Sequence, residues 1–179
     1  MRSFALFAII LISIAWSMSA AWADSACASL DIHVKSDAVS GNQNCKDGQT
    51  GGGDNGTALT ESIEIKGSGS YLYVSHLAAG VRTYLNQRNF EALVQDGTNF
   101  DRVENFTVHP SINKFSVRKF TGFMESDNRS YPCFALARYS GHVFSGYRHL
   151  VAGFYCEFIG EEVADTRVDE VMASIVTDF

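Results

Sequence analysis

The chain has 179 residues, of which 20 are acidic and 14 are basic, and it carries 13 phenylalanines and 7 tyrosines. The acidic balance argues against nucleic acid as a partner, and no run of basic residues offsets it. The aromatic side chains argue against a disordered polymer, because they supply apolar surface for a packed core. The composition therefore predicts a folded, acidic protein.

Residues 1–23 have the features of a secretory signal peptide. Arg2 precedes an apolar run, residues 4–14, and small side chains occupy Ala21 and Ala23, as a signal peptidase requires. The apolar run is too short for a bilayer span, which takes roughly 20 residues. We expect cleavage after Ala23 and export to the periplasm or the extracellular space.

Residues 24–179 have the length of a single domain. Removal of Arg2 with the signal peptide leaves 13 basic against 20 acidic residues, a net charge of −7. A lipid anchor at Cys27 is the alternative to cleavage after Ala23, but the stretch 24–26 lacks the apolar residue expected before a lipidated cysteine. No later segment is long and apolar enough to span a membrane.

All four cysteines follow the predicted cleavage site: Cys27, Cys45, Cys133 and Cys156. An even number of cysteines in an oxidising compartment favours disulfides, and four cysteines allow three pairings. Their order along the chain suggests one bond near each end.

The N-terminal part contains one predicted strand and one glycine-rich segment. Residues 30–35 alternate apolar and polar side chains, as a half-buried strand does. Residues 46–57 are rich in glycine and hold no apolar side chain, which predicts a flexible loop. A phosphate-binding loop would need a lysine after the last glycine, and a calcium-binding repeat would need several copies.

A hairpin and a helical region follow. Residues 62–66 and 71–75 are predicted strands on either side of a Gly-Ser turn. Residues 75–95 are helical in composition, but their apolar positions fall into two phases, so we expect one bent helix or two short ones. Asn89 is a candidate N-cap of the second part, which Gly97 would end.

The C-terminal half is mostly strand and closes on an amphipathic helix. β-branched and aromatic residues concentrate in 106–108, 114–120, 131–140 and 148–158. A turn is predicted at Asp127-Asn128. Helical spacing places five apolar side chains on one face: Val168, Val171, Met172, Ile175 and Val176. Thr166 and Asp169 resemble a capping box at the start of this helix.

Together these elements predict an α+β fold. The prediction is a mainly antiparallel sheet, with a bent helix in the N-terminal half and the C-terminal amphipathic helix packed on the sheet.

Residues 131–158 are predicted to form a hairpin held by a disulfide between Cys133 and Cys156. If these cysteines face each other, the neighbouring pairs are all apolar or aromatic: Ala135 with Phe154, Ala137 with Ala152, and Tyr139 with Leu150. The bond would close a loop of about 24 residues, worth about 3 kcal/mol in the chain-entropy model. The same register puts His142 and His149 on the face opposite the cysteines, which argues against a zinc site built from these residues.

That opposite face gathers polar side chains near the loop end of the hairpin. Arg138, Ser140 and His149 share it, with Arg148 beside them. In an acidic protein, such a cationic cluster can hold an anion or an acidic group of a partner. The alternative is that these residues mark the place where the strands enter solvent.

Sequence signatures of common exported enzymes are missing. The chain has no GxSxG motif, no HExxH motif and no SxxK motif with its partner motifs. His33, His76 and His109 are isolated in the sequence, so catalytic residues stay unassigned, and we expect no metal or other cofactor.

These observations predict a non-enzymatic module that binds a protein, a peptide or a small ligand through its sheet or the loops at its edges. The alternative is a small hydrolase acting on an envelope or extracellular polymer. Its acid and base groups would come from His149 and from carboxylates such as Glu61, Glu64, Glu161 and Glu162.

Overall fold

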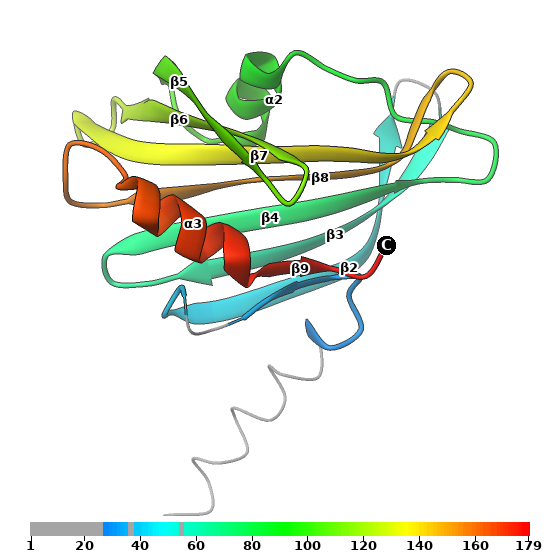
Figure 1. The fold of residues 1–179 in the computed structure, drawn as a ribbon, viewed down its shortest axis with the longest axis horizontal. Coiled ribbons are helices and arrows are strands. Elements are labelled where there is room, and N and C mark those ends of the chain that lie inside the picture. Colours follow the sequence, from blue (N-terminus) through cyan, green and yellow to red (C-terminus); the bar gives the residue numbers. More distant parts are fainter. Residues whose placement is uncertain (1–26, 36–37, 54–55) are drawn as a thin grey trace, which may run out of the picture.

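The computed structural model of the chain describes residues 27–35, 38–53 and 56–179 (Figure 1). The predicted signal peptide and its cleavage site lie outside these ranges. Within them, a mainly antiparallel sheet dominates the fold, together with two helices and two disulfides. The elements are β1 (Ile32–Val34), β2 (Asn42–Gly53), β3 (Gly56–Lys66), β4 (Ser70–Ala79), α2 (Phe90–Gly97), β5 (Arg102–Ile112), β6 (Phe115–Met124), β7 (Arg129–Val143), β8 (Gly146–Glu157), α3 (Asp165–Ser174) and β9 (Ile175–Thr177).

The strands of the described ranges form two sheets. Seven strands make a large antiparallel sheet in the order β2-β3-β4-β8-β7-β6-β5, and β1 pairs with β9 in a separate ribbon. In Figure 1, α3 and β9 lie across one face of the large sheet. The ribbon therefore joins two segments that are far apart in the sequence and lays them on the same face.

The face under α3 and the ribbon carries the larger hydrophobic core, called here the core face. Side chains alternate between faces along each strand, so one set from each central strand points toward α3. The core combines these side chains with those of the helix: Ile63, Ile65, Leu72, Val74, Phe115, Phe134, Leu136, Val151, Tyr155, Val168, Val171 and Met172. Burial of this apolar surface is the main force that holds α3 on the sheet.

The apolar face predicted for the C-terminal helix is confirmed only in part. Val168, Val171 and Met172 are buried against the sheet. The helix ends at Ser174, and the last two residues of the predicted stripe belong to β9, where Val176 pairs with His33. The capping box is wrong, because the N-cap is Ala164, which makes no side-chain hydrogen bond.

The opposite face of the large sheet, called the cavity face, has a smaller core. Val94 of α2 packs there with side chains from β6, β7 and β8, namely Phe120, Cys133, Ala135 and Cys156. Phe100 and Phe154 pack against the same cluster. Helix α2 and the segment around it thus cover the face that α3 leaves open.

The bent helix predicted for residues 75–95 is wrong in its first part. Strand β4 continues to Ala79, because Ser75 to Ala78 pair with both β3 and β8. These ladder contacts override the local helical composition. The second part is confirmed: α2 spans Phe90–Gly97, and Oδ1 of Asn89 accepts the main-chain N–H groups of Glu91 and Ala92 at 2.9 and 3.3 Å.

The glycine-rich segment also differs from the expectation of a loop. Strand β2 extends to Gly53 and pairs with β3, with a shift of register between Lys46 and Gln49. Gly48 lies at this irregularity with φ +69°, a conformation that suits glycine. Strand β3 supplies hydrogen-bond partners for the backbone groups of β2, so extended structure forms despite the low strand propensity of glycine.

The hairpin β7–β8 has the predicted register. Cys133 pairs with Cys156, Ala135 with Phe154, Ala137 with Ala152, and Tyr139 with Leu150. The predicted turn before β7 is also present: Asp127 Oδ1 accepts the N–H of Arg129 at 3.1 Å, and Asn128 has φ 53°.

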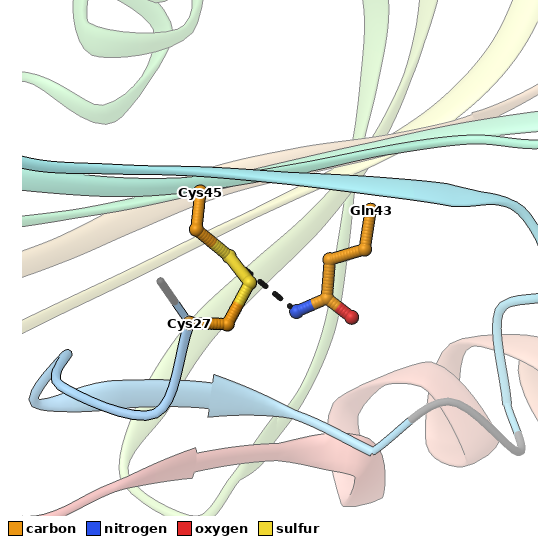
Figure 2. Close-up of a disulfide and its surroundings, with 3 residues drawn as sticks. All are labelled: Cys27, Gln43 and Cys45. Carbon is orange, nitrogen blue, oxygen red and sulfur yellow. Dashed lines mark hydrogen bonds between the residues drawn. A yellow bond between two sulfur atoms is a disulfide. The ribbon is translucent and has the colours of Figure 1, made fainter. Parts of the chain in front are cut away.

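Both disulfides have the pairing suggested by the order of the cysteines. One joins Cys133 to Cys156 inside the β7–β8 hairpin, and the other joins Cys27 to Cys45 (Figure 2). The second ties the segment before β1 to β2, where Gln43 Nε2 donates to Cys45 Sγ at 3.6 Å. Two disulfides fit an oxidising compartment such as the periplasm or the extracellular space.

Within the described ranges, no helix combines the length and the apolar character that a bilayer crossing demands.

Candidate functional site

A cavity of about 660 Å³ lies on the cavity face, between the large sheet and the segment that joins β4 to α2, residues 80–89, called here the covering segment. Alternate residues of β4 and β8 form its floor: Tyr73, Ser75, Leu77, Leu150, Ala152 and Phe154. Tyr84, Leu85, Leu93 and Val94 line it from the covering segment and α2. Most of these side chains are apolar or aromatic, so the cavity suits the carbon skeleton of a ligand.

The cavity also has polar groups. Arg88 forms an ion pair with Asp96, and both residues line the cavity along with Asn86. Thr98 is a further lining residue, and its Oγ1 is buried with no hydrogen-bond partner in the described part of the chain. A buried hydroxyl without a partner is costly, so this position lowers the stability of the cover.

Several contacts hold the covering segment above the sheet. Arg148 Nη1 donates to the carbonyl oxygens of Gly80 and Thr83 at 2.8 and 3.0 Å. Leu85 and Tyr147 exchange two main-chain hydrogen bonds of 2.8 and 3.0 Å. A Cβ atom at Gly146 would lie only 2.5 Å from the carbonyl oxygen of Leu85, so the close approach requires glycine. These contacts therefore fix the distance between the covering segment and the sheet, and with it the depth of the cavity.

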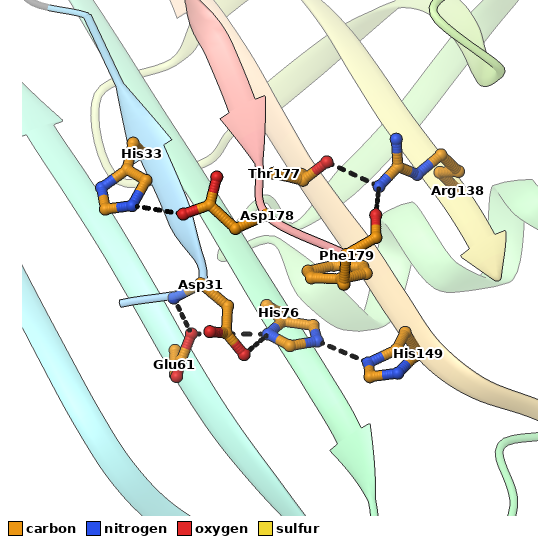
Figure 3. A network of polar contacts seen from close by, with 9 residues as sticks. All are labelled: Asp31, His33, Glu61, His76, Arg138, His149, Thr177, Asp178 and Phe179. Carbon is orange, nitrogen blue, oxygen red and sulfur yellow. Dashed lines mark hydrogen bonds and ion pairs between the residues drawn. The ribbon is translucent and has the colours of Figure 1, made fainter. Parts of the chain in front are cut away.

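The core face carries a polar chain at one end (Figure 3). Glu61 of β3 and His76 of β4 are direct partners in the sheet, and Glu61 Oε2 lies 3.4 Å from His76 Nδ1. The other ring nitrogen of His76, Nε2, lies 3.1 Å from Nδ1 of His149 on β8. Asp31 adds a second carboxylate, with Oδ2 4.0 Å from His76 Nδ1. His76 itself is only 1% exposed.

Phe179 covers this polar chain. Its ring stacks on His76 and His149, with centroid distances of 4.3 and 4.6 Å. Arg138 supports the C-terminal residues that carry this ring, because its Nη2 donates to Thr177 Oγ1 at 2.7 Å and to the carbonyl oxygen of Phe179 at 3.5 Å. Figure 3 shows these residues converging from β3, β4, β7 and β8, from the segment just before β1, and from the C-terminal end of the chain at and after β9.

The surroundings of His149 favour its neutral form. Burial lowers the pKa of His149 below its usual value, and the neighbouring His76 lowers it further, while Asp31 acts in the opposite direction. Burial likewise lowers the pKa of the Arg138 guanidinium. At neutral pH the His149 ring is therefore neutral, with one ring nitrogen as a hydrogen-bond donor and the other as an acceptor.

The structure brings only part of the predicted anion cluster together. Arg138, Ser140 and His149 lie on the core face, and both Arg138 Nε and Ser140 Oγ are buried without a hydrogen-bond partner among the described residues. Arg148 points to the cavity face, where it holds the covering segment.

The pairing of Glu61 with His76 was missed because His76 is isolated in the sequence. The predicted hairpin contained the signal: a register that pairs Lys66 with Tyr71 also pairs Glu61 with His76 if both strands continue. Asp31 gave no such signal, because its position depends on the pairing of β1 with β9.

Comparison with models of protein families, with curated proteins and with solved structures finds no match. The geometry of the two faces therefore carries the functional argument.

Proposed function

We propose that the protein is an exported, non-enzymatic binding module that takes a small, largely apolar ligand into the cavity between the sheet and α2. The observation that carries this proposal is the cavity itself, whose volume of about 660 Å³ falls within the range typical of small-molecule sites, roughly 300–1,000 Å³. The predicted signal peptide and the two disulfides support an extracytoplasmic location.

The lining indicates what kind of ligand would fit. The floor and the cover supply apolar and aromatic contacts through residues such as Leu77, Leu93 and Phe154. The polar side chains of Asn86, Arg88 and Asp96 supply directional contacts. A hydrocarbon or aromatic skeleton with a hydrogen-bonding group matches this combination, since apolar burial gives affinity and the polar contacts fix orientation.

A fluorescent apolar probe, 1-N-phenylnaphthylamine, tests this proposal. We expect its emission to rise and shift to the blue in the presence of the oxidised protein, with saturable binding. The variant Ala152→Phe places a ring in the floor of the cavity and should weaken binding at least tenfold. Leu77→Trp fills the same space from β4 and should act in the same way.

The matched control is Val108→Phe, which adds a ring at a residue that is 80% exposed on β5 and does not line the cavity. It should bind the probe like the wild type. Circular dichroism checks that each variant folds. Absence of saturable binding, or equal binding by wild type and both filled variants, would refute the proposal.

A hydrolase is the second candidate, and the chain Glu61–His76–His149 is the observation that favours it. A carboxylate that orients one histidine, which in turn contacts another, is an arrangement suited to proton transfer. The described residues around the cavity include no histidine, so this chemistry would take place on the core face. Turnover of an extracellular polysaccharide or peptidoglycan that His149→Gln abolishes would favour the hydrolase; turnover that survives this change would not.

A further inference from the structure

We propose that Asp31, Glu61 and His76 form a binding site for a divalent transition-metal ion, with Zn²⁺ as the best match. The site is separate from the cavity, because it lies on the core face of the sheet. In the described part of the chain, these three side chains bring one ligand atom each within 4.8 Å of one another. The proposal is therefore independent of the ligand-binding function.

The backbone positions the three side chains from three different segments of the chain. Glu61 and His76 are paired residues of β3 and β4, so the sheet ladder fixes their separation. Asp31 directly precedes β1, and its main-chain N–H donates to Glu61 Oε2 at 3.0 Å. Its carbonyl oxygen accepts the N–H of Asp178 at 3.0 Å. The convergence is thus a property of the fold and does not depend on long, mobile side chains.

Hydrogen bonds alone do not account for the approach of two carboxylates to one ring nitrogen. Two carboxylates approach His76 Nδ1, at 3.4 Å for Glu61 and 4.0 Å for Asp31, but a ring nitrogen can donate only one proton. Both distances exceed the roughly 2.7–2.9 Å of a charge-assisted hydrogen bond. Around a tetrahedral Zn²⁺, ligand atoms stand about 3.3–3.6 Å apart, given bonds of about 2.0–2.2 Å. A cation between the three groups would also remove the repulsion between the two carboxylates.

The residues around the cluster match the outer shell of a metal site. A histidine that binds a metal through one nitrogen usually donates the proton on its other nitrogen to a neighbouring acceptor. His76 has such a neighbour, since its Nε2 lies 3.1 Å from His149 Nδ1. The ring of Phe179 stacks on His76 and gives the site one apolar wall. These contacts would hold the imidazole in the orientation that ligation requires.

The donor set favours a transition ion over calcium or magnesium. One imidazole nitrogen and two carboxylates neutralise a divalent charge and leave a coordination position for water or a substrate. Calcium requires about 6–8 oxygen ligands, which these residues do not supply, whereas imidazole suits zinc and its neighbours. Access is provided from the Asp31 side, whose side chain is 59% exposed.

The test uses the purified, oxidised protein after treatment with a chelator. Titration calorimetry with Zn²⁺ should give one ion per chain, and Co²⁺ should give the visible absorption of a low-coordinate site. Asp31→Asn keeps the size of an exposed side chain and should weaken Zn²⁺ binding at least tenfold. Glu61→Gln should do the same, which keeps the test valid if one variant folds poorly.

Asp165→Asn is the matched control. Asp165 is also exposed, and its Oδ1 lies 3.6 Å from Nε2 of another buried histidine, His109, beside Lys119. The change should leave Zn²⁺ affinity as in the wild type. No binding of Zn²⁺ or Co²⁺, or equal Zn²⁺ binding by the wild type, Asp31→Asn and Glu61→Gln, would overturn the proposal. Tighter binding of Ca²⁺ than of Zn²⁺ would overturn the assignment to a transition ion.

Discussion

The two faces of the large sheet are covered in different ways. On the core face, α3 and the β1–β9 ribbon pack directly on the sheet, and side chains such as Leu72 and Val74 are fully buried. On the cavity face, α2 and the covering segment leave a space of about 660 Å³. The comparison suggests a division of tasks: packing on the core face stabilises the fold, and this stability allows the cavity face to keep an open site.

The largest expected difference concerns two leucines of the same strand. Leu72 is buried in the main core, whereas Leu77 lines the cavity. Leu72→Ala should lower the free energy of unfolding by roughly 4 kcal/mol, because it leaves a void in close-packed surroundings. Leu77→Ala should cost only about 1 kcal/mol, since its side chain already borders open space. Urea unfolding followed by circular dichroism measures both, and equal losses would contradict the division of tasks.

The two disulfides sharpen the comparison, because one belongs to each face. Cys133 and Cys156 are buried in the cluster of the cavity face, and Cys45 packs against the main core. Replacing either pair by alanine should lower the free energy of unfolding by about 3 kcal/mol, given the similar lengths of the closed loops.

Each of these two replacements should weaken a different kind of binding. Loss of Cys133–Cys156 should weaken probe binding in the cavity. Loss of Cys27–Cys45 frees the segment that positions Asp31, so it should weaken Zn²⁺ binding and leave the probe unaffected. If both replacements weakened both kinds of binding equally, the faces would not act separately.

The smallest expected effect is a dependence of stability on pH, which arises beside the turn that joins β3 to β4. Tyr71 Oη donates to Glu64 Oε1 at 2.8 Å, and this hydrogen bond is the main cause that lowers the pKa of Glu64 below 4.5. The contribution of Glu64 to stability is therefore complete above pH 4.5 and is lost as the pH falls through the lowered pKa. Burial, together with the bond to Glu64, raises the pKa of Tyr71.

A double-mutant cycle with Tyr71→Phe and Glu64→Gln measures this interaction. The coupling free energy should be about 1 kcal/mol at pH 7 and should vanish at low pH, where the carboxyl group is protonated. A coupling that did not change with pH would show that the charge of Glu64 contributes nothing.

The parts of the fold that could be predicted from the sequence are those with a local pattern. The β7–β8 register was predictable because apolar pairs such as Ala135 and Phe154 restrict it independently of the cysteines. The cap at Asn89 was predictable because its side chain bonds within the next three residues. Both features depend on residues that are close in the sequence or in one hairpin.

The features that were missed depend on contacts between distant segments. Ser75 to Ala78 are extended because β8 pairs with them across more than 70 residues. The cavity exists because hydrogen bonds from Arg148 and Tyr147 hold the covering segment at a fixed distance from the sheet. Asp31 reaches Glu61 and His76 because β1 pairs with β9. A pattern within one segment contains no information on any of these contacts.

The bond between Cys133 and Cys156 also has a mechanical consequence. It joins β7 and β8, which are neighbours near the middle of the large sheet. Under a pulling force, neighbouring strands usually separate by breaking hydrogen bonds one after another, but this pair is held by a covalent bond. These two strands should therefore stay joined after their hydrogen bonds break, whichever other pair of strands separates first, and they can serve as a unit from which the sheet re-forms.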